Sequence, residues 1–135
     1  MRELKWNESY SVGVKRFDDQ HQLVIGVLNR VFKMFETDSP PEELAIVLGE
    51  LAEYAQKHFS SEEQLMEKYK FHGLEGHIAE HRLYESKIAG FKDGLGSEDE
   101  KVRRDVLEFL ADWWMGHIQG CDKEYTRFLN NCGVF

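Results

Sequence analysis

Residues 77–81 read His-Ile-Ala-Glu-His, and residues 58–62 read His-Phe-Ser-Ser-Glu. Each stretch carries two metal-binding types of side chain spaced four residues apart. On a helix this spacing is close to one turn, so both side chains of a pair lie on the same face. The two stretches therefore predict two helices, each presenting a pair of ligand-type side chains in one direction.

The apolar residues around these stretches recur every three to four positions, which is the spacing of a buried helix face. They predict helices near 19–36, 39–69, 73–93 and 97–128, the last breaking after Gly120 and ending in a short C-terminal helix. No segment alternates with period two, so no sheet is expected. Short connections make consecutive helices antiparallel, and we expect an all-α, up-down-up-down four-helix bundle.

The predicted helix starts depend on capping residues, and the segment before the first helix has its own anchors. Asp18 or Asp19 can cap the first helix, and Ser39 can cap the second. An extended N-terminal arm, covering about residues 1–18, precedes the bundle. We expect Trp6 and Tyr10 to hold that arm against the helices.

The composition is that of one ordinary globular domain, and we expect residues 1–135 to form a single domain. The net charge of −8 argues against nucleic acid or an anionic membrane as partner and favours a monomer. No stretch approaches the roughly 20 apolar residues of a membrane span, and the N-terminus does not resemble a signal peptide. Two cysteines do not make a disulfide framework, so a cytoplasmic protein is expected.

Seven polar side chains fall on the apolar faces of the predicted helices. In an up-down bundle, the starts of the odd-numbered helices and the ends of the even-numbered helices lie at the same end. This rule brings all seven side chains to one end of the bundle interior. They are His21, His58, Glu62, His77, His81, His117 and Asp122.

The energetics of burial favour metal binding by this set. A buried carboxylate without a counter-charge costs several kcal/mol, about as much as the whole stability of a small domain. Few Lys or Arg residues are in phase with the apolar faces, whereas metal cations would balance the charge. Seven ligands are too many for one tetrahedral zinc and suit a pair of metals, with iron, manganese or zinc favoured. A lone histidine is more often a core residue, and His72, out of phase between two helices, is expected to be exposed.

These residues resemble the hemerythrin family, most closely its single-domain bacterial kind. The resemblance covers nearly the whole chain, and it implies the same up-down bundle. It is carried by five motifs, which are residues 6–13 (WNESYSVG), 17–21 (FDDQH), 58–63 (HFSSEE), 77–81 (HIAEH) and 117–125 (HIQGCDKEY).

The resemblance implies a pair of iron ions bridged by a solvent-derived oxo or hydroxo group. One iron would be coordinatively filled and the other would keep an open position, where O2 binds reversibly and is held as a hydroperoxide. The implied ligands are His77, His81 and His117 for the filled iron, His21 and His58 for the open iron, and Glu62 and Asp122 as bridges. The side chains expected near the O2 pocket are Val24, Phe59, Trp113, Trp114 and Ile118.

The resemblance implies storage, transport or delivery of O2, with no enzymatic activity, and an O2-consuming enzyme is a candidate recipient. Trp114 stands where a leucine is common in the family, so the size of the O2 pocket is open. One alternative is a sensor of O2, nitric oxide or redox state that acts through a separate partner. Another is a di-iron oxidation enzyme, although such sites use Glu-x-x-His motifs and this chain has none. Iron storage or a structural zinc site ranks lower.

Overall fold

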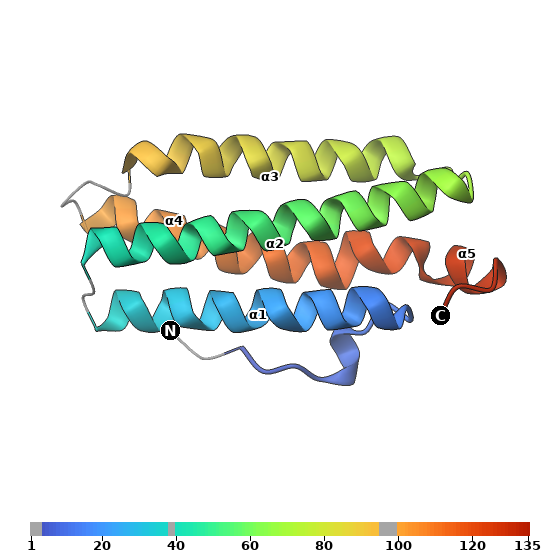
Figure 1. The fold of residues 1–135 in the computed structure, drawn as a ribbon, viewed down its shortest axis with the longest axis horizontal. Coiled ribbons are helices and arrows are strands. Elements are labelled where there is room, and N and C mark those ends of the chain that lie inside the picture. The colour runs from blue at the N-terminus through green and yellow to red at the C-terminus, as the bar shows by residue number, and fades with distance from the viewer. Residues whose placement is uncertain (1–3, 38–39, 95–99) are drawn as a thin grey trace.

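Four long helices pack side by side in alternating directions in a computed structural model of the chain, which describes residues 4–37, 40–94 and 100–135 (Figure 1). The all-α up-down bundle predicted from the sequence is confirmed, and the described residues contain no strand. The helices are α1 (Lys15–Glu36), α2 (Pro41–Lys68), α3 (Leu74–Gly94) and α4 (Glu100–Gly116). The chain ends in a π-helical turn η2 (His117–Cys121), a 3-10 turn η3 (Asp122–Tyr125) and the short helix α5 (Thr126–Asn131).

Helix α1 begins at Lys15, four residues before the predicted start, and this changes the role of Asp18. The carboxylate of Asp18 accepts hydrogen bonds from the Val12 backbone N–H at 2.8 Å and from Ser11 Oγ at 2.6 Å. The prediction that Asp18 or Asp19 caps the helix is therefore wrong. Asp18 lies inside the first turn, where its charge suits the helix dipole, and it ties the preceding arm to the helix.

The N-terminal arm lies along α1 and is held mainly by its backbone and by small apolar side chains. Val12 is fully buried, and Asn29 of α1 pairs with the backbone N–H and carbonyl of Leu4 at 2.8 and 2.7 Å. Trp6 and Tyr10, the predicted anchors, contact each other with ring centroids 5.9 Å apart, and both are only half-buried. Trp6 and Tyr10 are therefore not the sole anchors of the arm, because Val12 and the bonds between Asn29 and Leu4 also hold it against α1.

The apolar core forms two clusters, and the polar side chains singled out above lie between them along the helices. The larger cluster includes Val24, Phe59 and Ile118, and the smaller one includes Phe17 and Tyr125. On α1, for example, His21 falls between Phe17 of one cluster and Val24 of the other. The bundle therefore encloses a polar layer between two apolar regions.

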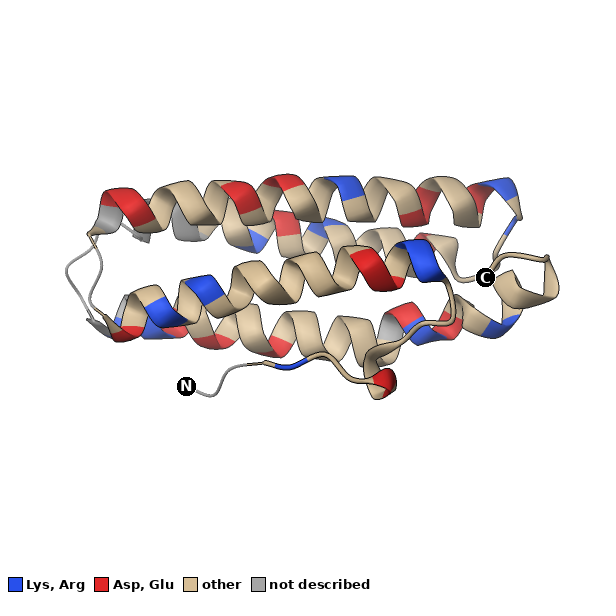
Figure 2. Ribbon diagram, turned by 60° about the horizontal axis from the view of Figure 1, so that its bottom comes forward, with Lys and Arg blue, Asp and Glu red and all other residues tan. Residues whose placement is uncertain are grey.

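Charged residues are spread over the outside of the bundle. Figure 2 shows Lys and Arg interspersed with Asp and Glu along the helices, rather than gathered on one basic face of the described part of the chain. Within the described ranges, no helix combines the length and apolar character that a membrane span requires. Ser39, the predicted cap of α2, lies outside the described residues.

Candidate metal centre

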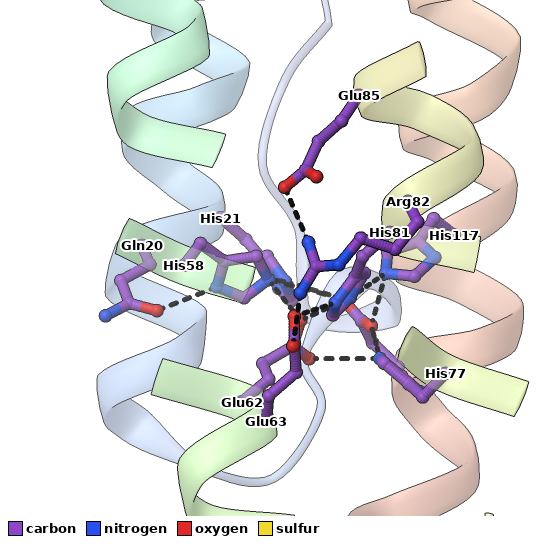
Figure 3. A network of polar contacts seen from close by, with 11 residues as sticks. Gln20, His21, His58, Glu62, Glu63, His77, His81, Arg82, Glu85 and His117 are labelled. Carbon is purple, nitrogen blue, oxygen red and sulfur yellow. Dashed lines mark hydrogen bonds and ion pairs between the residues drawn. The ribbon is translucent and has the colours of Figure 1, made fainter. Parts of the chain in front are cut away.

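All four long segments of the bundle contribute side chains to one buried layer (Figure 3). Helix α1 supplies one histidine, α2 a histidine and a glutamate, α3 two histidines, and the turns after α4 a histidine and an aspartate. Each of these residues is at most 3% exposed. The structure thereby brings together the seven predicted side chains, which are His21, His58, Glu62, His77, His81, His117 and Asp122.

The π-helical turn η2 explains how His117 and Asp122 reach the same layer. Five positions along a regular α-helix rotate a side chain by roughly 500°, which leaves it about 140° away from its starting direction. In η2 the backbone N–H of Asp122 donates to the carbonyl of His117, so the turn is one residue wider. As a result His117 Nε2 lies 2.9 Å from Asp122 Oδ1. The sequence signal for this turn was the spacing of five residues between His117 and Asp122. A regular α-helix does not explain that spacing, so the turn was not predicted.

The donor atoms divide into two groups that share both carboxylates. In each group, one ligand-type atom from every member lies within 4.8 Å of those of the others. The first group has three histidines and the second has two. Their members are Glu62, His77, His81, His117 and Asp122 in the first, and His21, His58, Glu62 and Asp122 in the second.

The distances within the layer fit the ligand shells of metal ions. Two donor atoms that each lie about 2.1 Å from one first-row metal ion are roughly 3 Å apart. The Nε2 atoms of His21 and His58 are 2.8 Å apart, and the Nε2 atoms of His81 and His117 are 3.2 Å apart.

The carboxylates give a second test of the fit. Both oxygens of Glu62 and Oδ2 of Asp122 are buried and have no partner with hydrogen-bond geometry among the described residues. Imidazole nitrogens nevertheless lie 2.8 to 3.6 Å from these oxygens. Buried carboxylate oxygens seldom lack partners, so the arrangement indicates donors directed at shared cations.

The outer ring nitrogens of two histidines are fixed by hydrogen bonds. Nδ1 of His58 lies 2.7 Å from Gln20 Oε1, and Nδ1 of His81 lies 2.8 Å from Glu63 Oε2 (Figure 3). Because an amide oxygen and a carboxylate only accept, Nδ1 must donate in both pairs, which directs Nε2 inward, where it can bind a metal ion once it carries no proton. Sequence reasoning missed Gln20 and Glu63, although each directly adjoins a predicted site residue.

The charges of the layer are strongly coupled. Burial alone would lower the pKa of His58 and of His77, but the neighbouring Glu62 and Asp122 carboxylates more than offset it and raise both pKa values to about 9. Burial would likewise raise the pKa of Asp122, yet the surrounding histidines, His117 first among them, hold it well below its usual range. The pKa of Glu62 is lowered as well, so both carboxylates stay ionised, and in the metal-free protein the protonated imidazoles beside them balance their charge.

Four of the five predicted pocket residues are fully buried, and the fifth is placed differently. Val24, Phe59, Trp114 and Ile118 are at most 1% exposed. Trp113 is half-buried, and its ring stacks on His117 with centroids 4.4 Å apart and planes 14° apart. Trp113 therefore covers a member of the three-histidine group.

Trp114 and Phe59 cover the inner faces of the layer. Phe59 stacks on His81 with centroids 3.9 Å apart, and Trp114 lies 6.4 Å from His58 by the same measure. The indole N–H of Trp114 donates to Tyr84 Oη at 3.1 Å. His72, predicted to lie apart from the site, is exposed.

Comparison with known proteins gives consistent matches over most of the chain. A family model described as the hemerythrin HHE cation binding domain matches residues 12–129. Bacteriohemerythrin of Methylococcus capsulatus is 28% identical over 94% of this chain and 97% of its own length. Myohemerythrin of Sipunculus nudus is 31% identical over 92% of each chain. A crystal structure of wild-type hemerythrin superimposes with a TM-score of 0.83 at 27% identity, covering 93% of this chain and 97% of that one.

Proposed function

The chain belongs to the hemerythrin family, and from this premise we propose that it stores or carries O2 by binding it reversibly at its di-iron centre. The observation that carries the proposal is the division of the donors into a three-histidine group and a two-histidine group that share two carboxylates. With both carboxylates bridging, the second group offers one ligand fewer than the first. One iron would then keep a position for O2.

Each residue of the layer has a role in this proposal. The iron held by three histidines would be filled, and O2 would bind on the side of His21 and His58. Glu62 and Asp122 would bridge the two ions. The remaining ligands are His77, His81 and His117.

The surrounding side chains would control what reaches the site. The bound irons would supply the electrons that O2 takes up on binding and returns on release. Buried apolar residues, namely Val24, Phe59, Trp114 and Ile118, would exclude water from that side. Five neutral imidazoles carry less negative charge than a carboxylate-rich site, which favours binding of O2 over cleavage of its bond. This reasoning supports a binding protein rather than an enzyme.

The test is reversible oxygenation of the iron-loaded protein. The protein is loaded with Fe(II) without air, its metal content is measured, and air is admitted. We expect about two irons per chain and a charge-transfer band that appears with O2 and disappears under vacuum over repeated cycles. A protein that passes once to a stable ferric form would contradict the proposal. Turnover of an added oxidisable substrate would favour the oxidation enzyme.

The finer predictions need separate measurements. The vibrational spectrum of the oxygenated protein tests the form in which O2 is held. Pull-down on iron-loaded protein distinguishes a sensor, which should recover a signalling partner, from an O2 carrier, which should recover an O2-consuming enzyme or nothing. A monomer located in the cytoplasm is part of the proposal and rests on the sequence predictions.

A further inference from the structure

The two halves of the metal centre differ in the group that holds a histidine from outside. On the two-histidine side, His58 donates from Nδ1 to the neutral amide of Gln20 at 2.7 Å. On the three-histidine side, His81 donates from Nδ1 to the carboxylate of Glu63 at 2.8 Å. The two hydrogen bonds have similar lengths, but the acceptor is neutral in the first and negatively charged in the second. A carboxylate acceptor increases the electron density that an imidazole donates to its metal, whereas an amide does so much less.

Glu63 is fixed in this role by a chain of ion pairs that reaches the surface (Figure 3). Its other oxygen, Oε1, lies 2.5 Å from Arg82, and Arg82 lies 2.7 Å from Glu85. The side chain of Glu63 is 16% exposed, while those of Arg82 and Glu85 are 51% and 41% exposed. Glu63 follows Glu62 on α2, and Arg82 follows His81 on α3, so this chain of contacts also joins the two helices beside the metal layer.

We propose that Glu63 is a positioning residue that acts through His81 to stabilise the ferric state of the three-histidine iron, and that Arg82 limits this effect. The proposal rests on the proposed function only in requiring iron at the site. The Arg82 guanidinium draws charge away from the Glu63 carboxylate, because a cation so close to a carboxylate weakens it as an acceptor toward His81. Glu63 and Arg82 should therefore act in opposite directions on the iron.

Three substitutions test whether Glu63 and Arg82 shift the reduction potential of the iron in opposite directions. Glu63→Gln keeps the shape and an accepting oxygen but removes the charge, so the ratio of ferric to ferrous protein at a fixed potential should fall about tenfold. For a one-electron step this corresponds to a rise in reduction potential of about 59 mV. Arg82→Gln should move the potential the other way. Glu85→Gln alters only the outer end of the series of ion pairs and should change the reduction potential least. Spectroelectrochemical titration measures the potential of all three variants.

The converse substitution lies on the other side of the centre. Gln20→Glu places a carboxylate against His58 and should lower the reduction potential of the loaded protein. A role limited to holding the helices together would not predict opposite shifts for Glu63→Gln and Arg82→Gln. Equal potentials in all four variants, or shifts of one sign for Glu63→Gln and Arg82→Gln, would overturn the proposal.

A measurement without iron separates this proposal from the proposed function. In metal-free protein with 15N-labelled histidine, NMR reports which ring nitrogen of His81 carries the proton. Glu63→Gln should reduce the Nδ1–H form, and Co(II) affinity should fall about tenfold to a hundredfold, as is usual when such a partner is lost. If the unaltered protein fails to oxygenate while these changes appear, only the proposed function fails. If the proton position and the Co(II) affinity do not change, the role of Glu63 is refuted.

Discussion

His117 and Asp122 are five residues apart, yet His117 Nε2 lies 2.9 Å from Asp122 Oδ1 because η2 is a π-helical turn. In a regular α-helix this spacing would point the two side chains about 140° apart, so the wider turn is what brings both donors into the metal layer. π-helical turns are rare and are frequently found at functional sites. The short 3-10 turn that follows carries Tyr125 into the smaller apolar cluster, so the same turn also sets the path of the C-terminus.

Insertion of one alanine after Gly120 tests the importance of this turn. With that extra residue Asp122 comes six positions after His117, and along a regular α-helix its side chain should point about 120° away from the layer. We expect the iron content to fall to about half or less, while the helical circular dichroism stays near that of the unaltered protein. Gly120→Ala is the matched control, since a Cβ there meets nothing within 4 Å and the spacing is kept. Full iron content in the insertion variant would contradict the assigned role of the turn.

His58→Ala tests the two-histidine group. The substitution removes one of the two imidazoles on the side where O2 is proposed to bind, and it leaves Gln20 without the ring to which it bonds. We expect reversible oxygenation to be lost and iron to fall toward one per chain, because the three-histidine group is intact. His72→Ala, at an exposed position, should leave both quantities unchanged. Retained iron with reversible oxygenation in His58→Ala would show that this ligand assignment is wrong.

Much of the bundle and of its polar layer could be predicted because both depend on helical periodicity. His77 and His81 share a face by spacing alone, and the up-down order then brings them to the level of His21 and His58. The start of α1 was harder to predict, since Asp18 suits either a cap or a first turn. Its bonds to Ser11 and Val12, which decide the matter, depend on how the arm folds back.

The contacts between helices could not be predicted because they depend on rotation and depth, which the spacing does not specify. Glu63 follows a predicted site residue and was given no role of its own, yet it reaches across to His81. Trp113 and Trp114 are neighbours in sequence and both read as pocket residues. One stacks on His117 and the other lies near His58, because adjacent positions on a helix point about 100° apart.

The pKa values predict that metal loading releases protons. In the metal-free protein, His58 and His77 have pKa values near 9, against about 6.5 in an unfolded chain. At pH 7 both carry a proton, and a metal must displace it. Calorimetry of Co(II) binding at pH 7 in buffers of different ionisation enthalpy should show a release of about two protons per chain. Identical heats in all buffers would contradict these pKa values.

The same shifts predict how stability depends on pH. A histidine whose pKa is raised on folding stabilises the protein fully below about pH 6.5, and this contribution is lost as the pH rises through about 9. The metal-free protein should therefore unfold at progressively lower temperature over that range. The loaded protein, whose imidazoles are already deprotonated, should show a much smaller change. Thermal unfolding curves at several pH values measure both.

Gly13→Ala should detach the N-terminal arm from α5. Gly13 has a φ of +72°, and a Cβ there would lie 2.7 Å from a methyl carbon of Thr126, whose hydroxyl donates to the Val12 carbonyl. We expect a loss of about 1–3 kcal/mol in the free energy of unfolding. Gly26→Ala is the control on the exposed side of α1, where nothing lies within 4 Å, and it should stabilise by roughly 0.5–1 kcal/mol. Urea unfolding at equal metal content compares them, and equal effects would contradict this explanation.

Trp114→Leu tests whether the large ring controls access to the centre. Trp114 is fully buried, contacts Phe59 at 5.7 Å between centroids and covers one side of His58. Its hydrogen-bond partner Tyr84, together with Ala55, also lines an open pocket of about 290 Å³. A leucine would leave empty space beside Tyr84 and His58, so water should reach the iron more easily. We expect the oxygenated protein to autoxidise several-fold faster and the free energy of unfolding to drop by about 2–3 kcal/mol.

Tyr84→Phe separates the effect of space from that of the hydrogen bond. It removes only the hydroxyl that accepts from the Trp114 indole, so it should cost about 1–3 kcal/mol in stability while the ring stays in place. Autoxidation should then stay close to that of the unaltered protein. If Tyr84→Phe accelerates autoxidation as much as Trp114→Leu does, orientation of the indole matters more than its volume. If neither variant changes the rate, the space beside His58 does not limit the approach of water, and Trp114 serves the core alone.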